Sequence, residues 1–167
     1  MSVIRLRTPL TRADVRDLRP GDRVLLSGVV YTARDAAHKR LVELLDAGKP
    51  LPFPLPGSAV FYAGPCPAPP GRVIGSVGPT TSGRMDSYAP RLMREGFHIM
   101  IGKGPRSETV RDVLRQTGCV YLSAIGGAAA LTARKVTGSE PVAFEDLDTE
   151  AIAALTVEDM PLIVSDI

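Results

Sequence analysis

Residues 97–124 read FHIMIGKGPRSETVRDVLRQTGCVYLSA, which is a complete strand–helix–strand pattern. The apolar runs at its two ends, 97–101 and 119–124, have the length and composition of buried strands. Ser107 heads a loose capping box between them, and the apolar residues that follow it have helical spacing (Val110, Val113 and Leu114). Strands separated by a helix in this way are typical of parallel pairing, so this stretch indicates an α/β fold.

The same alternation extends outward on both sides of this stretch. Residues 23–31 form a predicted strand, and the helix after it begins at Thr32 or Asp35 and ends at Gly48. The other predicted elements are apolar runs typical of strands (58–63, 73–77 and 162–164), a helix (86–95) and an alanine-rich helix that ends near Lys135. The sequence therefore predicts a single α/β domain over residues 1–167 with a mixed, partly parallel sheet.

Composition narrows the class of protein. With 44% apolar and 23% charged residues, the 167-residue chain resembles an ordinary soluble domain, and its net charge of +2 gives no reason to expect a nucleic-acid partner. The two cysteines, Cys66 and Cys119, are too few for a metal cage, so no metal site is predicted in this chain, and both are expected to be reduced, with Cys119 buried. Because no apolar run approaches the roughly 18 residues of a membrane span, we expect no membrane partner and a cytoplasmic location.

The segment 78–86, GPTTSGRMD, is the strongest candidate for a ligand site. It places three hydroxyl side chains and a guanidinium between an apolar run and a helix, where they suit an anion such as a phosphate or a carboxylate. The hydroxyls of such a segment also commonly serve only to cap a helix. The segment alone leaves both interpretations open.

Three cations occupy predicted strand-to-helix junctions: Arg34, Arg84 and Lys103. The carboxyl ends of strands in an open α/β sheet meet at one edge, where ligands usually bind. Three positive charges at that edge suit a dicarboxylate, with each arginine offering a planar fork to one carboxylate. The alternative is three unrelated surface cations, which a chain with 20 lysines and arginines easily supplies.

Other residues near these junctions have weaker signals. A threonine hydroxyl such as that of Thr80 transfers a proton only with a partner group, and no strong base lies nearby in the sequence. This suggests half of a site, completed by another chain or domain. His38 lies one turn after Arg34 and either faces the same pocket or is structural. Gly126 and Gly127 supply either backbone N–H groups to an anion or a close helix–strand contact.

Six ordered segments together resemble one known family: 31–38, 61–65, 75–86, 100–104, 125–129 and 157–164. The chain is similar to the β subunit, or C-terminal region, of iron–sulfur class I fumarate hydratases and L(+)-tartrate dehydratases. The resemblance implies a swivelling β/β/α domain and a hydro-lyase that acts on a dicarboxylic acid. It also implies a partner α subunit, which carries a [4Fe–4S] cluster on three cysteines and forms an oligomer with this chain.

The resemblance assigns roles by position. Arg34, Arg84 and Lys103 would hold the substrate carboxylates, and Thr80 would take part in proton transfer with an acid of the α subunit. Supporting roles fall to the neighbouring members of the motifs (Asp35, His38, Thr81, Gly126 and Gly127).

Three functions remain open at this point. The first is hydration of fumarate to (S)-malate, the second is dehydration of tartrate to oxaloacetate, and the third is a non-catalytic anion-binding module for assembly.

Overall fold

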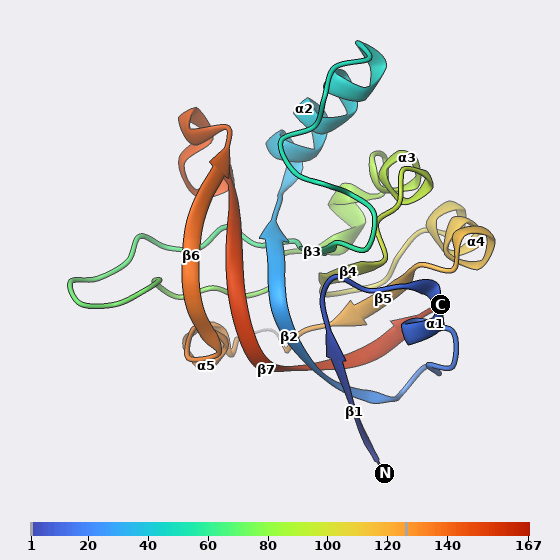
Figure 1. Cartoon of the computed structure of the whole chain (residues 1–167), viewed down its shortest axis with the longest axis horizontal. Helices are drawn as coiled ribbons and strands as arrows, with labels where there is room; N and C mark the ends of the chain where they lie inside the picture. The colour runs from blue at the N-terminus through green and yellow to red at the C-terminus, as the bar shows by residue number, and fades with distance from the viewer. Residues whose placement is uncertain (1, 126) are drawn as a thin grey trace.

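The computed structural model describes residues 2–125 and 127–167 (Figure 1). Its strands are β1 (Val3–Arg7), β2 (Arg23–Thr32), β3 (Ala59–Phe61), β4 (Ile99–Gly102), β5 (Val120–Ser123), β6 (Val136–Ala143) and β7 (Ile152–Asp166). Its α-helices are α1 (Arg12–Val15), α2 (Asp35–Asp46), α3 (Ala89–Arg94), α4 (Glu108–Thr117) and α5 (Ala129–Ala133). Two 3₁₀ turns, η1 (Ser82–Met85) and η2 (Glu145–Glu150), complete the elements.

The strands form one mixed sheet in the order β1-β2-β3-β4-β5-β7-β6. Neighbouring strands from β1 to β5 are parallel, whereas β7 runs antiparallel to β5, β6 and β2. The extra pairing of β7 with β2 closes β2, β3, β4, β5 and β7 into a five-stranded barrel. The predicted mixed, partly parallel sheet is confirmed, while the swivelling β/β/α arrangement stays a prediction.

Closure of the barrel depends on two unusual strands. β7 has 15 residues, so different parts of it reach β6, β2 and β5 in turn. β2 bends at an irregularity between Leu26 and Gly28, where Gly28 has φ +104°. A side chain on Gly28 would also collide with Thr8, so only glycine fits this bend.

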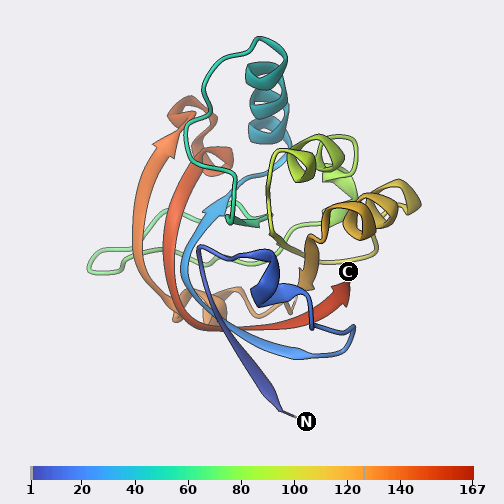
Figure 2. The ribbon, with the colours of Figure 1, turned by 45° about the vertical axis from the view of Figure 1, so that its right-hand side comes forward.

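Period-two alternation divides the core into two clusters. Ala59, Phe61, Ile99 and Ile101 are buried with the cluster inside the barrel. Their neighbours Val60 and Met100 face outward and belong to the second cluster. That cluster also contains Leu41 of α2, Leu92 of α3 and Val110 of α4, and these helices lie together on one side of the barrel (Figures 1 and 2). Each large apolar side chain buried in this way stabilises the fold by about 1.5–3 kcal/mol.

Two sequence predictions need correction in the segment between β3 and β4. The apolar run 73–77 is not a strand; residues 64–77 form an extended arm beside β6 (Figures 1 and 2). The opposite side of the arm contains four prolines, which lack the N–H groups that a ladder needs, so only isolated bonds form, such as Cys66 N–H to the Ser76 carbonyl at 2.9 Å. The predicted helix 86–95 begins only at Ala89, after the 3₁₀ turn η1.

Candidate functional site

The carboxyl ends of the adjacent parallel strands β2, β3 and β4 lie at one edge of the sheet. Arg34 follows β2 as the N-cap of α2, and Lys103 follows β4 directly. Lys103 is exposed and makes no ion pair with any residue that the structure describes. These two cations therefore lie where strand polarity places ligands in sheets of this kind.

The Thr80 segment is fixed against the same edge by backbone hydrogen bonds. Both the N–H and the hydroxyl of Thr80 donate to the Tyr62 carbonyl just after β3, at 2.7 and 2.8 Å. The N–H of Lys103 donates to the Thr80 carbonyl at 3.3 Å, and Thr81 forms an isolated parallel bridge with Lys103. The segment thus continues the sheet for one residue beyond β4 and brings the two threonines beside Lys103.

Arg84 reaches the start of α2 through an ion pair. Its Nε donates to Oδ2 of Asp35 at 2.9 Å, and one terminal nitrogen lies 2.7 Å from the same oxygen. The Arg84 side chain is 53% exposed, so this pair contributes little to stability and leaves part of the guanidinium open to a ligand. Asp35 links η1, which carries Arg84, to the N-terminus of α2 beside Arg34.

His38 lies inside the protein, one turn after Arg34. Its Nδ1 is 2.8 Å from the Arg34 carbonyl, and its ring packs edge-on against Tyr62 with centroids 5.3 Å apart. Burial lowers the pKa of His38 to about 4, although its bond to Arg34 opposes the shift. The ring is therefore neutral near pH 7 and adds no charge to the cationic edge.

Of the two glycines before α5 that were candidates for anion binding or for a close helix–strand contact, only Gly127 is among the described residues. Gly126 lies outside the described residues. Gly127 is exposed with φ +80°, and no atom lies within 4 Å of the position that a Cβ would occupy. Backbone conformation, rather than a close helix–strand contact, therefore explains a glycine at position 127.

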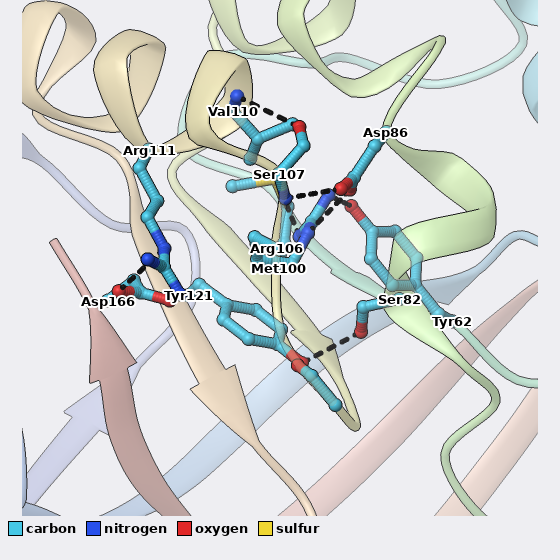
Figure 3. Close-up of polar contacts among 11 residues, drawn as sticks. Tyr62, Ser82, Asp86, Met100, Arg106, Ser107, Val110, Arg111, Tyr121 and Asp166 are labelled. Atoms are coloured by element: carbon cyan, nitrogen blue, oxygen red, sulfur yellow. Dashed lines mark hydrogen bonds and ion pairs between the residues drawn. The ribbon is translucent and has the colours of Figure 1, made fainter.

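A buried arginine that the sequence did not suggest lies beneath this edge. Arg106 is 4% exposed; its Nε donates to Oδ1 of Asp86 at 2.8 Å, and a terminal nitrogen donates to the Tyr62 hydroxyl at 3.3 Å (Figure 3). The guanidinium also lies 5.2 and 4.9 Å from the ring centroids of Tyr62 and Tyr121. The other oxygen of Asp86 accepts the Ser107 N–H at 2.6 Å.

A second part of this network joins the same two loops. The Ser82 and Tyr121 hydroxyls are 2.8 Å apart (Figure 3). The Tyr121 hydroxyl donates to the Gly104 carbonyl at 2.8 Å. Residues 80–86 and 103–107 are therefore connected by polar contacts at Arg106 and Ser107, and through Tyr121 at Gly104. The 78–86 segment, which contains Ser82 and Asp86, and the Ser107 cap were the sequence signals near this network.

The side chains that the structure describes are not arranged to hold an iron–sulfur cluster or another metal ion. Cys66 is exposed on the arm, whereas Cys119 is buried with its thiol directed to the Phe97 carbonyl. Within residues 2–125 and 127–167, no group of three His, Cys, Asp or Glu side chains lies close enough to hold a metal ion. Over the same residues, no helix has the length and apolar character needed to traverse a bilayer.

Residues 1–166 match a protein family described as the fumarase C-terminus. The chain belongs to this family. It is homologous to class I fumarate hydratases and to tartrate dehydratase β subunits, which confirms the resemblance drawn from the ordered motifs. As a member of the fumarase C-terminal family, it corresponds to the C-terminal, or β, module of these hydro-lyases.

Relatives of two lengths define how much of such a protein the chain represents. The anaerobic class I fumarate hydratase of Escherichia coli is 44% identical over 144 residues, which cover 85% of this chain and 26% of that enzyme. Fumarate hydratase 2 of Leishmania major is 42% identical over 146 residues, 86% of this chain and 26% of the relative. The chain thus spans about a quarter of the fumarate hydratases that it matches.

The match to two shorter relatives covers most of the length of each relative. A protein of Methanocaldococcus jannaschii named as a putative L(+)-tartrate dehydratase subunit beta is 38% identical over 162 residues, which are 93% of this chain and 83% of the relative. The L(+)-tartrate dehydratase subunit beta of E. coli is 34% identical over 165 residues, 96% and 81% of the two chains.

Proposed function

We propose that this chain is the β module of a hydro-lyase that reversibly hydrates fumarate to (S)-malate together with an α subunit. In this proposal Arg34, Arg84 and Lys103 bind the two carboxylates of the substrate. One observation carries most of the weight: Arg34 and Lys103 follow β2 and β4, two parallel strands that both pair with β3, and Arg84 lies on the loop whose backbone pairs with Lys103. Family membership supports the reaction class.

The three cations divide the work of binding by their chemistry. A doubly negative substrate needs at least two positive groups, and a guanidinium contacts a carboxylate through two parallel N–H bonds, whereas the Lys103 ammonium acts as a point charge. Asp35 already holds one side of Arg84, so its guanidinium has a set orientation before a ligand arrives. Preorientation of this kind reduces the entropy that binding costs.

Thr80 is proposed as the proton-transfer group. Its hydroxyl hydrogen is donated to the Tyr62 carbonyl, which fixes the direction of the oxygen and leaves its lone pairs as acceptors. A neutral threonine cannot act as a base without a second group, so an acidic residue of the α subunit is proposed to complete the step. The [4Fe–4S] cluster is likewise assigned to the α subunit, because this chain lacks ligands for it among the described residues.

Reconstitution tests the proposal. The purified chain alone is expected to show no hydration of fumarate, and addition of an α subunit is expected to produce turnover, followed by the loss of fumarate absorbance. Rapid turnover by the chain alone, or none by the reconstituted pair, would reject the proposal.

Tartrate is the second candidate substrate. The β subunits named for L(+)-tartrate dehydratase match 83% and 81% of their own lengths to this chain, whereas the fumarate hydratases match about a quarter of theirs. The reconstituted pair, supplied with (S)-malate and with L(+)-tartrate in separate assays, distinguishes the candidates. Formation of oxaloacetate from tartrate, without turnover of malate, would favour the second function.

A further inference from the structure

We infer that Glu150, at the end of η2, is a positioning residue that orients the Arg34 guanidinium for the substrate carboxylate. This inference rests on the proposed function, because it assigns a role to a residue that acts through Arg34. Glu150 itself is not proposed to touch the substrate.

The two side chains face each other in a partly buried setting. Nε of Arg34 lies 3.9 Å from Oε1 of Glu150, and the side chains are 24% and 32% exposed. Both atoms are buried and have no hydrogen-bond partner among the described residues. An unpaired buried N–H or carboxylate oxygen carries a desolvation cost, which a small approach of the two groups would remove. The local energetics therefore favour contact between Arg34 and Glu150.

Gly64 confines Arg34 from another side. A Cβ on Gly64 would lie 3.1 Å from both Cδ and one terminal nitrogen of Arg34, and 2.7 Å from the Thr149 carbonyl oxygen. The Arg34 side chain and the Thr149–Glu150 backbone thus both pack against the same glycine. This packing leaves Arg34 little freedom to turn away from Glu150.

The segment that carries Glu150 is anchored before that residue. Both terminal nitrogens of Arg40, on α2, donate to the carboxylate of Asp146, at 2.8 and 2.5 Å. The same guanidinium lies 5.3 Å from the centre of the Phe144 ring. Phe144 and Asp148 have φ of 59° and 52°, which non-glycine residues adopt only where the surroundings hold them. The turn is therefore held against the helix that begins next to Arg34.

The segment that carries Glu150 is also anchored after that residue. The hydroxyl of Thr32, at the end of β2, accepts the Ala153 N–H at 3.0 Å and lies 3.4 Å from the Ala151 carbonyl. Thr32 is fully buried and precedes Arg34 by two residues. The backbones on either side of the Arg34–Glu150 pair are consequently tied together, so the pair meets in a defined geometry.

This arrangement determines which part of Arg34 can meet a ligand. Because Nε is buried on the Glu150 side, the terminal nitrogens are the ones available to a carboxylate. Arg84 has a matching arrangement, in which Asp35 holds Nε and one terminal nitrogen. Arg34 and Arg84 are thus each oriented by an acidic residue of the same chain. Removal of that acidic residue should weaken substrate binding more than it slows the chemical step.

The test is a double-mutant cycle in the complex of this chain with its α subunit. Glu150→Gln is expected to raise KM for (S)-malate about tenfold with little change in kcat, and to weaken binding of the unreactive dicarboxylate succinate to a similar extent. In an Arg34→Ala background, which itself raises KM, Glu150→Gln is expected to add nothing, because the effect passes through Arg34. Glu145→Gln, an exposed acid in the same turn, is the matched control and should leave KM unchanged.

The outcomes separate this inference from the proposed function. An unchanged KM in Glu150→Gln would overturn the inference, and so would an effect of Glu150→Gln that adds fully to that of Arg34→Ala. In both cases a raised KM in Arg34→Ala would still support the proposed function. An unchanged KM in Arg34→Ala would instead reject the role of Arg34 in the proposed function, and the inference with it. If Glu150→Gln fails to assemble, Glu150→Asp keeps the charge and should retain most of the affinity if charge orients Arg34.

Discussion

Arg106 donates to Asp86 at 2.8 Å between two loops, and the arginine side chain is completely buried. The Asp86 loop carries Thr80 and Arg84, whereas the Arg106 loop begins at Lys103. Burial lowers the pKa of Arg106, but its contacts with Tyr62 and Asp86 more than offset this effect and leave the pKa above its ordinary value. A permanent buried charge therefore links the loops that carry three of the proposed site residues.

Asp86→Asn should destabilise the protein strongly. It would leave the buried Arg106 charge without its counter-charge, a change that typically costs about 3–5 kcal/mol of unfolding free energy. Urea denaturation measures the effect. Asp112→Asn, which removes an exposed acid paired with Arg115, is the matched control and should cost far less. Equal losses in the two variants would contradict the structural role of the Arg106–Asp86 pair.

Gly64→Ala should disturb the site while sparing most of the fold. The added methyl group would lie 2.7 Å from the Thr149 carbonyl and 3.1 Å from Arg34, so Arg34 must move. We expect a higher KM for the dicarboxylate in the assembled enzyme. Gly138→Ala, whose nearest contact would be 3.4 Å from Thr156 Oγ1, serves as the control. A wild-type KM in Gly64→Ala would show that Arg34 does not need its observed position.

His38 should make the fold sensitive to acid. Its pKa is about 4 in the folded chain because of burial and about 6.5 when unfolded, so the unfolded state binds a proton first as the pH falls. The stability is complete above pH 6.5 and declines as the pH falls toward 4, by up to roughly 3 kcal/mol from this group. Denaturation of the wild type and of His38→Phe between pH 7 and 4.5 checks this. The same pH dependence in both proteins would contradict it.

The two cysteines should differ sharply in reactivity. Cys66 is exposed, whereas burial raises the pKa of the Cys119 thiol and removes it from solvent. In the folded protein, iodoacetamide should therefore modify Cys66 alone, and Cys119 should react only after denaturation. Peptide mass spectrometry identifies the modified residue. Early labelling of Cys119 would indicate that α4 and β5 open readily.

The sequence predicted elements whose contacts are local. The β4–α4–β5 unit follows from apolar spacing over 28 residues and from the Ser107 cap, whose side chain accepts the Val110 N–H as expected. By contrast, only 162–164 of β7 was identified as strand-like. Polar residues alternate with apolar ones along β7, and the strand forms by pairing with β2, which lies far away in the chain. Local patterns cannot specify this closure of the barrel.

The same distinction applies to the candidate site. Arg34 and Lys103 could be placed at one edge because strand polarity alone determines it. Arg106 and Glu150 could not, because their partners Asp86 and Arg34 meet them only through tertiary packing. The apolar run 73–77 was wrongly predicted to be a strand. A strand also requires a neighbour with free N–H groups, and the prolines opposite this run have none.

The most direct measurement of the central claim is kcat/KM for (S)-malate in the complex with the α subunit, compared between wild type and Arg84→Ala. If Arg84 binds a substrate carboxylate, loss of a charge-assisted contact worth about 1.5–3 kcal/mol should lower kcat/KM by about 10- to 150-fold. Arg115→Ala, an exposed arginine with a similar ion pair, should leave it unchanged. Wild-type kcat/KM in Arg84→Ala would contradict the claim that these cations bind a dicarboxylate together.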